Sequence, residues 1–218
     1  MVSGMRAVML DVPRQLLEER RRLGLDRWDE VWEGELHMVP PPHGDHGCLN
    51  DELGVFFKLH WERLGLGRTF LETGVRRRDA GPLAELQDRP SDYRTPDRAF
   101  LLPGRFDRYQ DGWIVGGPDA VLEIESPGDE SRQKLPFYLA IGVREVLLVH
   151  RVTRQVEVLR ATEPGYVLAA PDPDGWVRSQ VLRTAFRTQP GGSAAGDEQP
   201  PALLLRRWDE PGRELRIG

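Results

Sequence analysis

Three carboxylates lie on one face of the segment 119–125, which alternates in the manner of a β-strand. Asp119, Glu123 and Glu125 share that face with a valine, and small or aliphatic residues occupy the opposite face. A predicted helix and an apolar strand follow, so we expect this strand to belong to a sheet that is covered on at least one side. Like charges in a covered sheet require a reason, and binding a cation is a chemical one.

Asp97 follows Pro96 at the start of a short predicted strand within residues 93–101. A Pro-Asp pair by itself is more typical of a turn than of a functional site. If this strand is the neighbour of the segment 119–125, joined to it through the loop 103–117, Asp97 and Glu123 meet on one face of the sheet. Two carboxylates that meet in this way can bind a hard cation such as Mg²⁺ together with several waters.

Lys134 is one of only two lysines in a chain that has 28 arginines. Arginine is therefore the usual cation of this sequence, and a lysine is an exception. The segment 132–141 predicts a helix that ends at Gly142, which places Lys134 in the first turn. A compact ammonium suits contact with an attacking water or a phosphoryl oxygen better than a planar guanidinium does.

His43, His46 and Cys48 crowd the start of a helix predicted over residues 45–64. These side-chain types can bind zinc, but no second pair of ligands elsewhere in the sequence would complete a tetrahedral site. His46, in the first helical turn, either faces a polar cleft or is simply exposed to solvent. The sequence leaves these two alternatives for His46 open.

The rest of the chain shows short strands and helices separated by turns. Before the acidic strand, the pattern predicts a helix over 13–23 capped by Asp11, a strand or hairpin over 28–39 with Gly34 at a bulge or turn, a strand over 68–76 and a long loop over 79–93. After it, Asp129 or Ser131 can cap the helix at 132–141, and we expect strands over 144–150, 155–160, 165–170, 176–182 and 202–208. Residues 189–201 are predicted to form a flexible linker or loop.

Composition indicates a single soluble domain over residues 1–218. Hydrophobic residues make up 39% and charged residues 30%, and no apolar run approaches the roughly 18 residues that a membrane span requires. A single cysteine excludes an intrachain disulfide, which favours the cytoplasm. The net charge of −5 gives no global attraction for nucleic acid, and the arginine runs at 20–22 and 76–78 are most simply solvated faces.

Several motifs occur together in an order that is typical of a known family. They are WDEVWEGEL followed by a proline-rich turn, His46 at the head of a helix, TPD with Asp97, PDAVLEIESP with Glu123, and KLPFYLAIGVREVLLV with Lys134. Across about residues 28–160 the chain resembles the Uma-two-like putative restriction endonucleases, a branch of the PD-(D/E)XK nuclease superfamily. The resemblance depends on the combination, because each motif alone is weak.

The resemblance implies an α/β (α+β mixed-sheet) fold with a restriction-endonuclease-like core, in which helices flank a central mixed sheet. It also implies that Asp97 and Glu123 bind a metal and that Lys134 supplies the positive group. The superfamily pattern places a lysine two residues after the second acid, where this chain has Glu125. Lys134, from the following helix, suits that displaced role.

The resemblance further implies that Glu30 and His46 border the pocket. Glu125 lies on the same strand face as Glu123, so it can extend the site toward a second metal or raise the pKa of a neighbouring acid by like-charge repulsion. We therefore count Glu125 with Asp97 and Glu123 among the candidate catalytic residues.

These inferences predict a Mg²⁺-dependent endonuclease, with Mn²⁺ as a substitute, that hydrolyses DNA; a homodimer is compatible with the sequence. The cation would polarise the phosphate and activate a water, and the lysine would offset developing charge. Two other hypotheses stay open. In one, the chain keeps the fold but only binds a nucleic acid or a protein partner, because no target-recognition module is evident. In the other, two acids divide general acid and base roles, as in glycoside hydrolysis.

Overall fold

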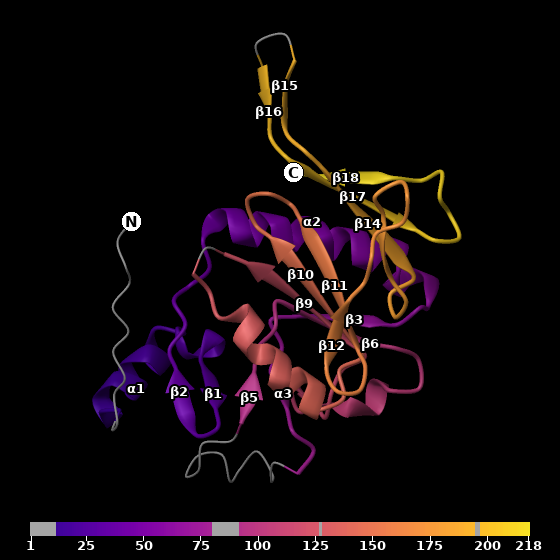
Figure 1. Ribbon diagram of the computed structural model, residues 1–218. Helices are drawn as coiled ribbons and strands as arrows, with labels where there is room; N and C mark the ends of the chain where they lie inside the picture. The colour runs from indigo at the N-terminus through magenta and orange to yellow at the C-terminus, as the bar shows by residue number, and fades with distance from the viewer. Residues whose placement is uncertain (1–11, 80–91, 127, 195–196) are drawn as a thin grey trace.

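The structure is a computed structural model that describes residues 12–79, 92–126, 128–194 and 197–218. A six-stranded mixed sheet forms its centre (Figure 1). Its strands, in spatial order, are β12 (Tyr166–Leu168), β11 (Val156–Ala161), β10 (Glu145–His150), β9 (Ala120–Glu125), β6 (Arg98–Leu101) and β3 (Arg68–Leu71). The two central strands, β9 and β10, are parallel, whereas β6 and β11 flank them in antiparallel orientation. The predicted α/β fold with a central mixed sheet is confirmed.

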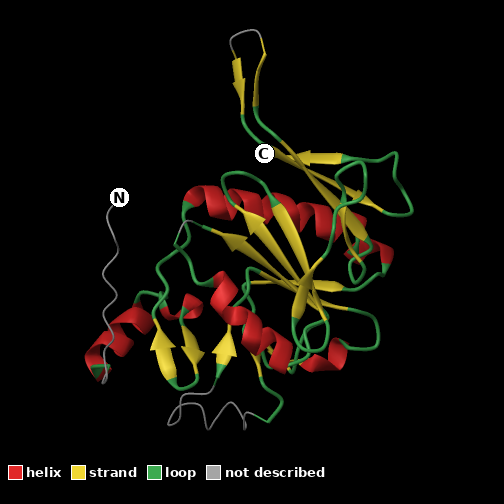
Figure 2. Ribbon diagram, viewed as in Figure 1, coloured by secondary structure: helices red, strands yellow, loops and turns green. Residues whose placement is uncertain are grey.

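Helices cover both faces of the central sheet, as Figure 2 shows. The longer helix, α2 (Gly44–His60), lies over one face, and the short α3 (Leu135–Ala140) lies over the other. The core beneath α2 includes Leu49, Leu53, Phe57, Leu122, Ile124, Leu147 and Val149, and the core beneath α3 includes Val121, Phe137, Tyr138, Val146 and Leu148. Because side chains alternate along a strand, β9 and β10 contribute to both cores.

The connection from β9 to β10 is the predicted crossover, but its helix begins as a 3₁₀ turn. That turn, η5, spans Ser131–Lys134, and α3 follows with Pro136 in its first turn, where the missing N–H would have had no partner. Neither predicted cap occupies the N-cap position, which is Glu130 and makes no side-chain capping bond. Asp129 accepts a hydrogen bond from the main-chain nitrogen of Ser131 at 3.2 Å. Gly142, with φ at +83°, follows the end of α3 as predicted.

A second mixed sheet contains the N-terminal hairpin. Its strands, in spatial order, are β2 (Glu35–His37), β1 (Glu30–Trp32), β5 (Tyr93–Arg94), β4 (Val75–Arg76), β8 (Trp113–Val115) and β7 (Tyr109–Gln110). Glu33 and Gly34 join β1 to β2 with φ of +51° and +92°, and left-handed values at both positions are those of the tight turn that suits the twist of a hairpin. Gly34 therefore occupies a turn, as predicted.

Arg94 connects this second sheet to α3. Its buried guanidinium donates a hydrogen bond to the carbonyl of Val31 at 2.8 Å. The same group lies over the ring of Trp32 at 4.5 Å and over the ring of Phe137 at 4.3 Å. Planar stacking of this kind is available to arginine and not to lysine, so Arg94 holds the hairpin against the helix.

A four-stranded antiparallel sheet closes the core near the C-terminal end of α2. Its strands, in spatial order, are β13 (Val177–Ser179), β14 (Thr184–Gln189), β17 (Ala202–Arg207) and β18 (Leu215–Ile217). One face of this sheet contributes Phe186, Leu203, Leu205 and Ile217 to the core beneath α2. The sequence analysis did not predict β14, because its segment lacks a sustained apolar alternation.

Residues 189–201, predicted to be a flexible linker or loop, form a two-stranded hairpin instead. The strands β15 (Gly192–Ala194) and β16 (Asp197–Gln199) pair in the same register in which Gln189 of β14 pairs with Ala202 of β17. The hairpin thus continues the β14–β17 ladder, as Figure 1 shows. Pro190, Pro200 and Pro201 lie at the interruption, where proline cannot donate a ladder hydrogen bond. The prolines are evident from the composition, but the pairing of β14 with β17 and of β15 with β16 is not.

Other boundaries differ from the prediction by a few residues. The helix expected at 13–23 is α1 (Arg14–Arg22), while its predicted cap, Asp11, and most of the loop 79–93 lie outside the described residues. The strand expected at 68–76 divides between two sheets, because the chain turns at Glu72, where φ is +41°. The helix expected at 45–64 ends at His60 and continues as a 3₁₀ turn, η2 (Glu62–Leu64). Within the described ranges, no helix is long and apolar enough to cross a membrane.

Gly54→Ala in α2 is expected to destabilise the protein, because an added methyl group there meets Arg98. The new carbon would lie 2.2 Å from Nη2 of Arg98, a buried guanidinium that donates to the carbonyl of Asn50 and so joins β6 to α2. We expect a loss of about 1–3 kcal/mol in the free energy of unfolding. Gly47→Ala, in the same helix with open space around its added carbon, should instead gain up to about 1 kcal/mol. Urea unfolding measures both changes, and equal effects would contradict the predicted collision with Arg98.

Candidate active site

Asp97 immediately precedes strand β6, and Glu123 lies on the neighbouring strand β9 of the central sheet, so the two strands are neighbours as the sequence analysis supposed. Arg98 pairs with Leu122 across β6 and β9, so Asp97 stands immediately before β6 and opposite Glu123. The main-chain nitrogen of Ile124 donates a hydrogen bond to Oδ2 of Asp97 at 2.6 Å. This bond holds the Asp97 carboxylate against the end of β9, beside the position of Glu123.

Lys134 joins Glu123 to a second buried carboxylate, Glu30 of β1. Its ammonium lies 3.3 Å from Oε1 of Glu123 and 2.9 Å from Oε1 of Glu30. The side chains of Glu123 and Glu30 are 3% and 2% exposed, so neither charge is screened by much water. One cation therefore serves two buried anions, and Asp97 adds a third carboxylate nearby.

The electrostatics of this group favour an additional positive charge. Burial raises the pKa of Asp97 to about 7 and that of Glu123 to about 8, against the opposing effect of Lys134. Burial alone would lower the pKa of Lys134, but the carboxylates of Glu123 and Glu30 raise it well above its usual value. The ammonium is thus kept charged, while the carboxylates lack enough positive charge to offset their desolvation.

Hydrogen bonds fix Glu30 and Glu123 in place. The main-chain nitrogen of Thr95 donates to Oε1 of Glu30 at 2.8 Å, and the indole of Trp32 donates to Oε2 at 2.7 Å. The hydroxyl of Tyr138, in α3, donates to Oε1 of Glu123. Burial and the negative charge of Glu123 raise the pKa of Tyr138 well above its usual value, so the phenol remains a donor.

His46, in the first turn of α2, contacts Asp97. Its Nε2 lies 3.1 Å from Oδ1 of Asp97, and its side chain is 12% exposed. The side chain of His46 is thus not simply exposed to solvent, because it contacts the largely buried carboxylate of Asp97. Burial, followed by the charge of Arg151, lowers the pKa of His46, which makes the neutral ring the dominant form near pH 7. His43 and Cys48 lie apart from this contact, because His43 accepts a hydrogen bond at the start of α2 and Cys48 is exposed.

The other two acids of the β9 face have different surroundings. Glu125 accepts from Nε of Arg132 at 2.8 Å, and Arg132 also pairs with Glu157 at 2.9 Å, so Glu125 belongs to a partly exposed ion-pair group. Asp119 lies at the opposite end of the strand, where it accepts from the main-chain nitrogen of Leu102 at 2.9 Å. Of the three carboxylates on this face, Glu123 is the one that contacts Lys134.

Sequence analysis missed Tyr138, Thr95 and Trp32. Tyr138 follows Lys134 by four residues, so both could have been placed on one helical face and both directed toward β9. The main-chain donor of Thr95 had no comparable signal, since any residue can supply an N–H. Trp32 stands two residues after Glu30 on the same face of a strand, but neither residue's partner could be inferred from that spacing.

The carboxylates fit a hard divalent cation. Among the described residues, no group of three or more histidine, cysteine or acidic side chains is arranged to hold a metal ion. A magnesium ion, however, is commonly bound through one or two carboxylates and keeps several waters. Asp97 and Glu123 provide two buried, adjacent carboxylates whose pKa values are raised by burial, and they meet that smaller requirement.

Comparison with protein-family models gives a match over residues 18–189, to the family Uma2, described as "Putative restriction endonuclease". The matched residues make up more than three quarters of the chain. The chain belongs to the Uma2 family. The family predicted from the sequence motifs is confirmed, and the site residues in question, from Glu30 to Tyr138, lie inside the matched region.

One solved structure is similar to this Uma2 chain in its fold. The crystal structure of a putative nuclease from Anabaena variabilis matches with a TM-score of 0.53 and 21% sequence identity, over 71% of this chain and 82% of that chain. At this identity the likeness shows the fold alone, which is the restriction-endonuclease-like fold predicted from the sequence. No protein of the curated set matches the sequence.

Glu123→Gln is expected to stabilise the metal-free protein at alkaline pH. Because burial raises the pKa of Glu123 to about 8, the folded protein retains a proton that the unfolded chain releases above its usual pKa. Stability of the parent should therefore fall as the pH rises from about 5 to 8, and glutamine removes that contribution. Thermal unfolding in EDTA should show a gain of several degrees at pH 8.5 and little difference at pH 4.5.

Glu157→Gln is the matched control, because it removes a partly exposed carboxylate from the ion pair with Arg132. We expect a change of less than about 1 kcal/mol at either pH. A loss of stability in Glu123→Gln at pH 8.5 would show that the contacts with Lys134 and Tyr138 outweigh the desolvation of the carboxylate.

Proposed function

We propose that this Uma2 protein is a metal-dependent endonuclease that hydrolyses DNA phosphodiester bonds. The family and the fold support a nuclease. The observation that supports the finer proposal is the buried contact of Lys134 with Glu123, beside Asp97, which stands opposite Glu123 just before β6. Two carboxylates for a hard cation and a fixed ammonium are the groups that hydrolysis of a phosphodiester requires.

Asp97 and Glu123 would hold Mg²⁺, with Mn²⁺ as its substitute. When bound, such an ion polarises a phosphoryl oxygen and lowers the pKa of a nearby water. The main-chain nitrogen of Ile124 keeps Asp97 oriented for this role, and the hydroxyl of Tyr138 does the same for Glu123. His46 contacts the other oxygen of Asp97, so its neutral ring can restrain that carboxylate without competing for it as a cation.

Lys134 would orient the attacking water and offset the charge that develops on the phosphoryl oxygens. The two carboxylates that it contacts keep its ammonium protonated and restrict its position. Glu30 is therefore a positioning residue for Lys134, which gives a specific role to one of the two residues expected to border the pocket. Glu125 is assigned a smaller role than Glu123, because its carboxylate contacts Arg132. The cytoplasmic location and the homodimer stay predictions.

The first test of this proposal is metal binding. Mn²⁺ should raise the thermal midpoint of the parent and release or absorb heat in calorimetry, because an ion that binds only the folded state stabilises it. Asp97→Asn and Glu123→Gln should lose both responses. Glu125→Gln should retain them, since its carboxylate pairs with Arg132. An equal Mn²⁺ response in the parent, Asp97→Asn and Glu123→Gln would reject these two residues as the ligands.

The second test is the chemistry at Lys134. In single-turnover cleavage of plasmid and single-stranded DNA with Mg²⁺ or Mn²⁺, Lys134→Arg and Lys134→Ala should each lose about 100-fold or more in rate. A guanidinium keeps the charge but cannot occupy the position of a compact ammonium between Glu30 and Glu123. Lys58→Arg is the matched control, because the only other lysine is exposed and pairs with Glu62 on the surface. It should cleave at the parent's rate.

Two outcomes would contradict the proposal. Parent-like rates in both Lys134 variants, with Mn²⁺ binding intact, would reduce Lys134 to a structural residue. A parent that cleaves neither substrate, with Asp97→Ala as the blank for contaminating nuclease, would favour the hypothesis of a nuclease fold that only binds its partner.

A further inference from the structure

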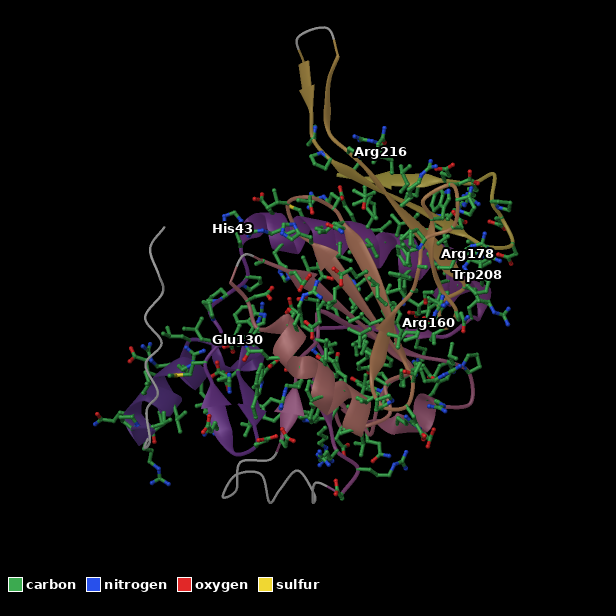
Figure 3. The ribbon with its side chains drawn as sticks, viewed as in Figure 1. His43, Glu130, Arg160, Arg178, Trp208 and Arg216 are labelled. Carbon is green, nitrogen blue, oxygen red and sulfur yellow. The ribbon has the colours of Figure 1, made fainter. Side chains whose placement is uncertain are left out.

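The C-terminal sheet has one face in the core and one face free of it. Side chains alternate along β13, β14, β17 and β18, and Phe186, Leu203, Leu205 and Ile217 occupy the face in the core. The residues between them must point the other way. The outward face so defined carries Arg178, Arg187, Arg206 and Arg216, one on each of the four strands. We call it the arginine face; Figure 3 labels Arg178 and Arg216 on it.

Strand register arranges these arginines in two rows. In one row, Arg178 of β13 and Arg206 of β17 stand on either side of Ala185. In the other row, Arg187 of β14 and Arg216 of β18 stand on either side of Leu204. Neighbouring strands are about 4.8 Å apart, so the two arginines of a row are on strands about 10 Å apart. The backbone positions of the four arginines thus spread over the outward face of the sheet.

Trp176 holds two of the guanidiniums in place. It precedes β13 on the outward side and is only 2% exposed, because the guanidinium carbons of Arg206 and Arg187 lie over its ring at 3.9 and 4.6 Å. The N–H donors of a guanidinium lie in its own plane, so a guanidinium that stacks on a ring can still donate hydrogen bonds from its edge. Less side-chain freedom is then lost when these donors bind an anion.

Acidic neighbours offset only part of this charge. Arg178 contacts Asp172 at 3.1 Å, and Arg187 contacts Glu214 at 3.7 Å. Arg206 and Arg216 instead donate to main-chain carbonyls, of Pro211 at 3.3 Å and of Gly218 at 3.0 Å. A carbonyl bond leaves the charge of an arginine in place and uses one of its five donors. The arginine face therefore has more positive than negative groups, although the whole chain has a net charge of −5.

We propose that the arginine face binds the phosphate backbone of duplex DNA, away from the bond that is cleaved. The face suits a partner with closely spaced negative charges on a rigid surface, and duplex DNA carries one charge per about 1.7 Å of its axis. His46 of the active site is near the start of α2, whereas Phe56 and His60 near its end line a pocket with Leu215 of β18. A 17-residue helix spans about 25 Å, so the C-terminal sheet packs at the end of α2 that is far from His46.

The family match covers only part of this face, with Arg178 and Arg187 inside it. It ends at residue 189, so β17 and β18, which carry Arg206 and Arg216, lie beyond it. The identity of the partner rests on the proposed nuclease function, but the contact itself does not require cleavage. Binding can therefore be measured on the full chain without metal.

The test is duplex binding by Arg178→Gln/Arg216→Gln, a pair chosen because both side chains are exposed and neither stacks on Trp176. Anisotropy of a labelled duplex of about 30 base pairs is recorded in EDTA over a salt series. The parent should bind with a steep salt dependence. The variant should bind about tenfold or more weakly near 0.1 M salt, and its slope of log affinity against log salt should shrink by about 2. Arg178→Lys/Arg216→Lys should retain most of the affinity, because a phosphate also accepts from an ammonium.

Arg21→Gln/Arg22→Gln, on the exposed side of α1, is the control with the same change in net charge. It should bind as the parent does. Hydrolysis of a small chromogenic phosphodiester with Mn²⁺ should proceed equally in the parent and in the arginine-face variant, while cleavage of the long duplex should fall in the variant. Equal thermal midpoints would show that the variant folds.

The outcomes separate this proposal from the proposed nuclease function. Duplex binding that depends on the arginine face, in a protein without hydrolytic activity, would support the contact and reject the nuclease. A parent that does not bind duplex at low salt, a variant with parent-like affinity and slope, or an equal loss in the α1 control would overturn the arginine-face proposal. Tighter binding of the parent to vesicles with anionic lipid than to DNA, lost in the variant, would overturn it in favour of a membrane surface.

Discussion

The ammonium of Lys134, placed between the buried carboxylates of Glu30 and Glu123, is the interaction on which the arrangement of the molecule depends. Each partner comes from a different element: the N-terminal hairpin, the central sheet and the 3₁₀ turn before α3. Three buried charges in this relation stabilise one another only when all three elements are in place. The buried charges are therefore paired only when the two sheets and the turn before α3 are assembled.

This group of buried charges has more carboxylates than cations. One ammonium cannot neutralise Glu30, Glu123 and Asp97 together, and burial raises the pKa of both Asp97 and Glu123. A protein that needed only a stable sheet would place apolar side chains at these strand ends. The central sheet instead keeps carboxylates close to one another and partly sheltered from water. A divalent cation binds most favourably where negative charges are arranged in this way.

Much of this could be predicted from the sequence where the deciding signals are local. The alternation of residues 119–125, the crossover and the following strand determined the β9–α3–β10 unit, and the scarcity of lysine singled out Lys134. The pairing of Asp97 with Glu123 required only that two short strands be neighbours. The contact of Glu30 with Lys134 could not be derived in this way, because it joins a strand of the N-terminal hairpin to a 3₁₀ turn more than a hundred positions later in the chain. For Glu125, the local pattern was misleading. It shares a strand face with Glu123, but its carboxylate pairs with Arg132 and does not contact Lys134.

Arg94 has a consequence for how this site can change during evolution. The hairpin that carries Glu30 is held by a carbonyl at Val31 and by the flat ring of Trp32, both contacted by the same guanidinium. A main-chain carbonyl is present whatever residue occupies position 31, whereas Trp32 is both the ring beneath the guanidinium and the indole donor to Glu30. The side chain at position 31 can therefore change without loss of the Arg94 contact, while position 32 needs a ring that is also an N–H donor if the carboxylate of Glu30 is to stay in place beside Lys134.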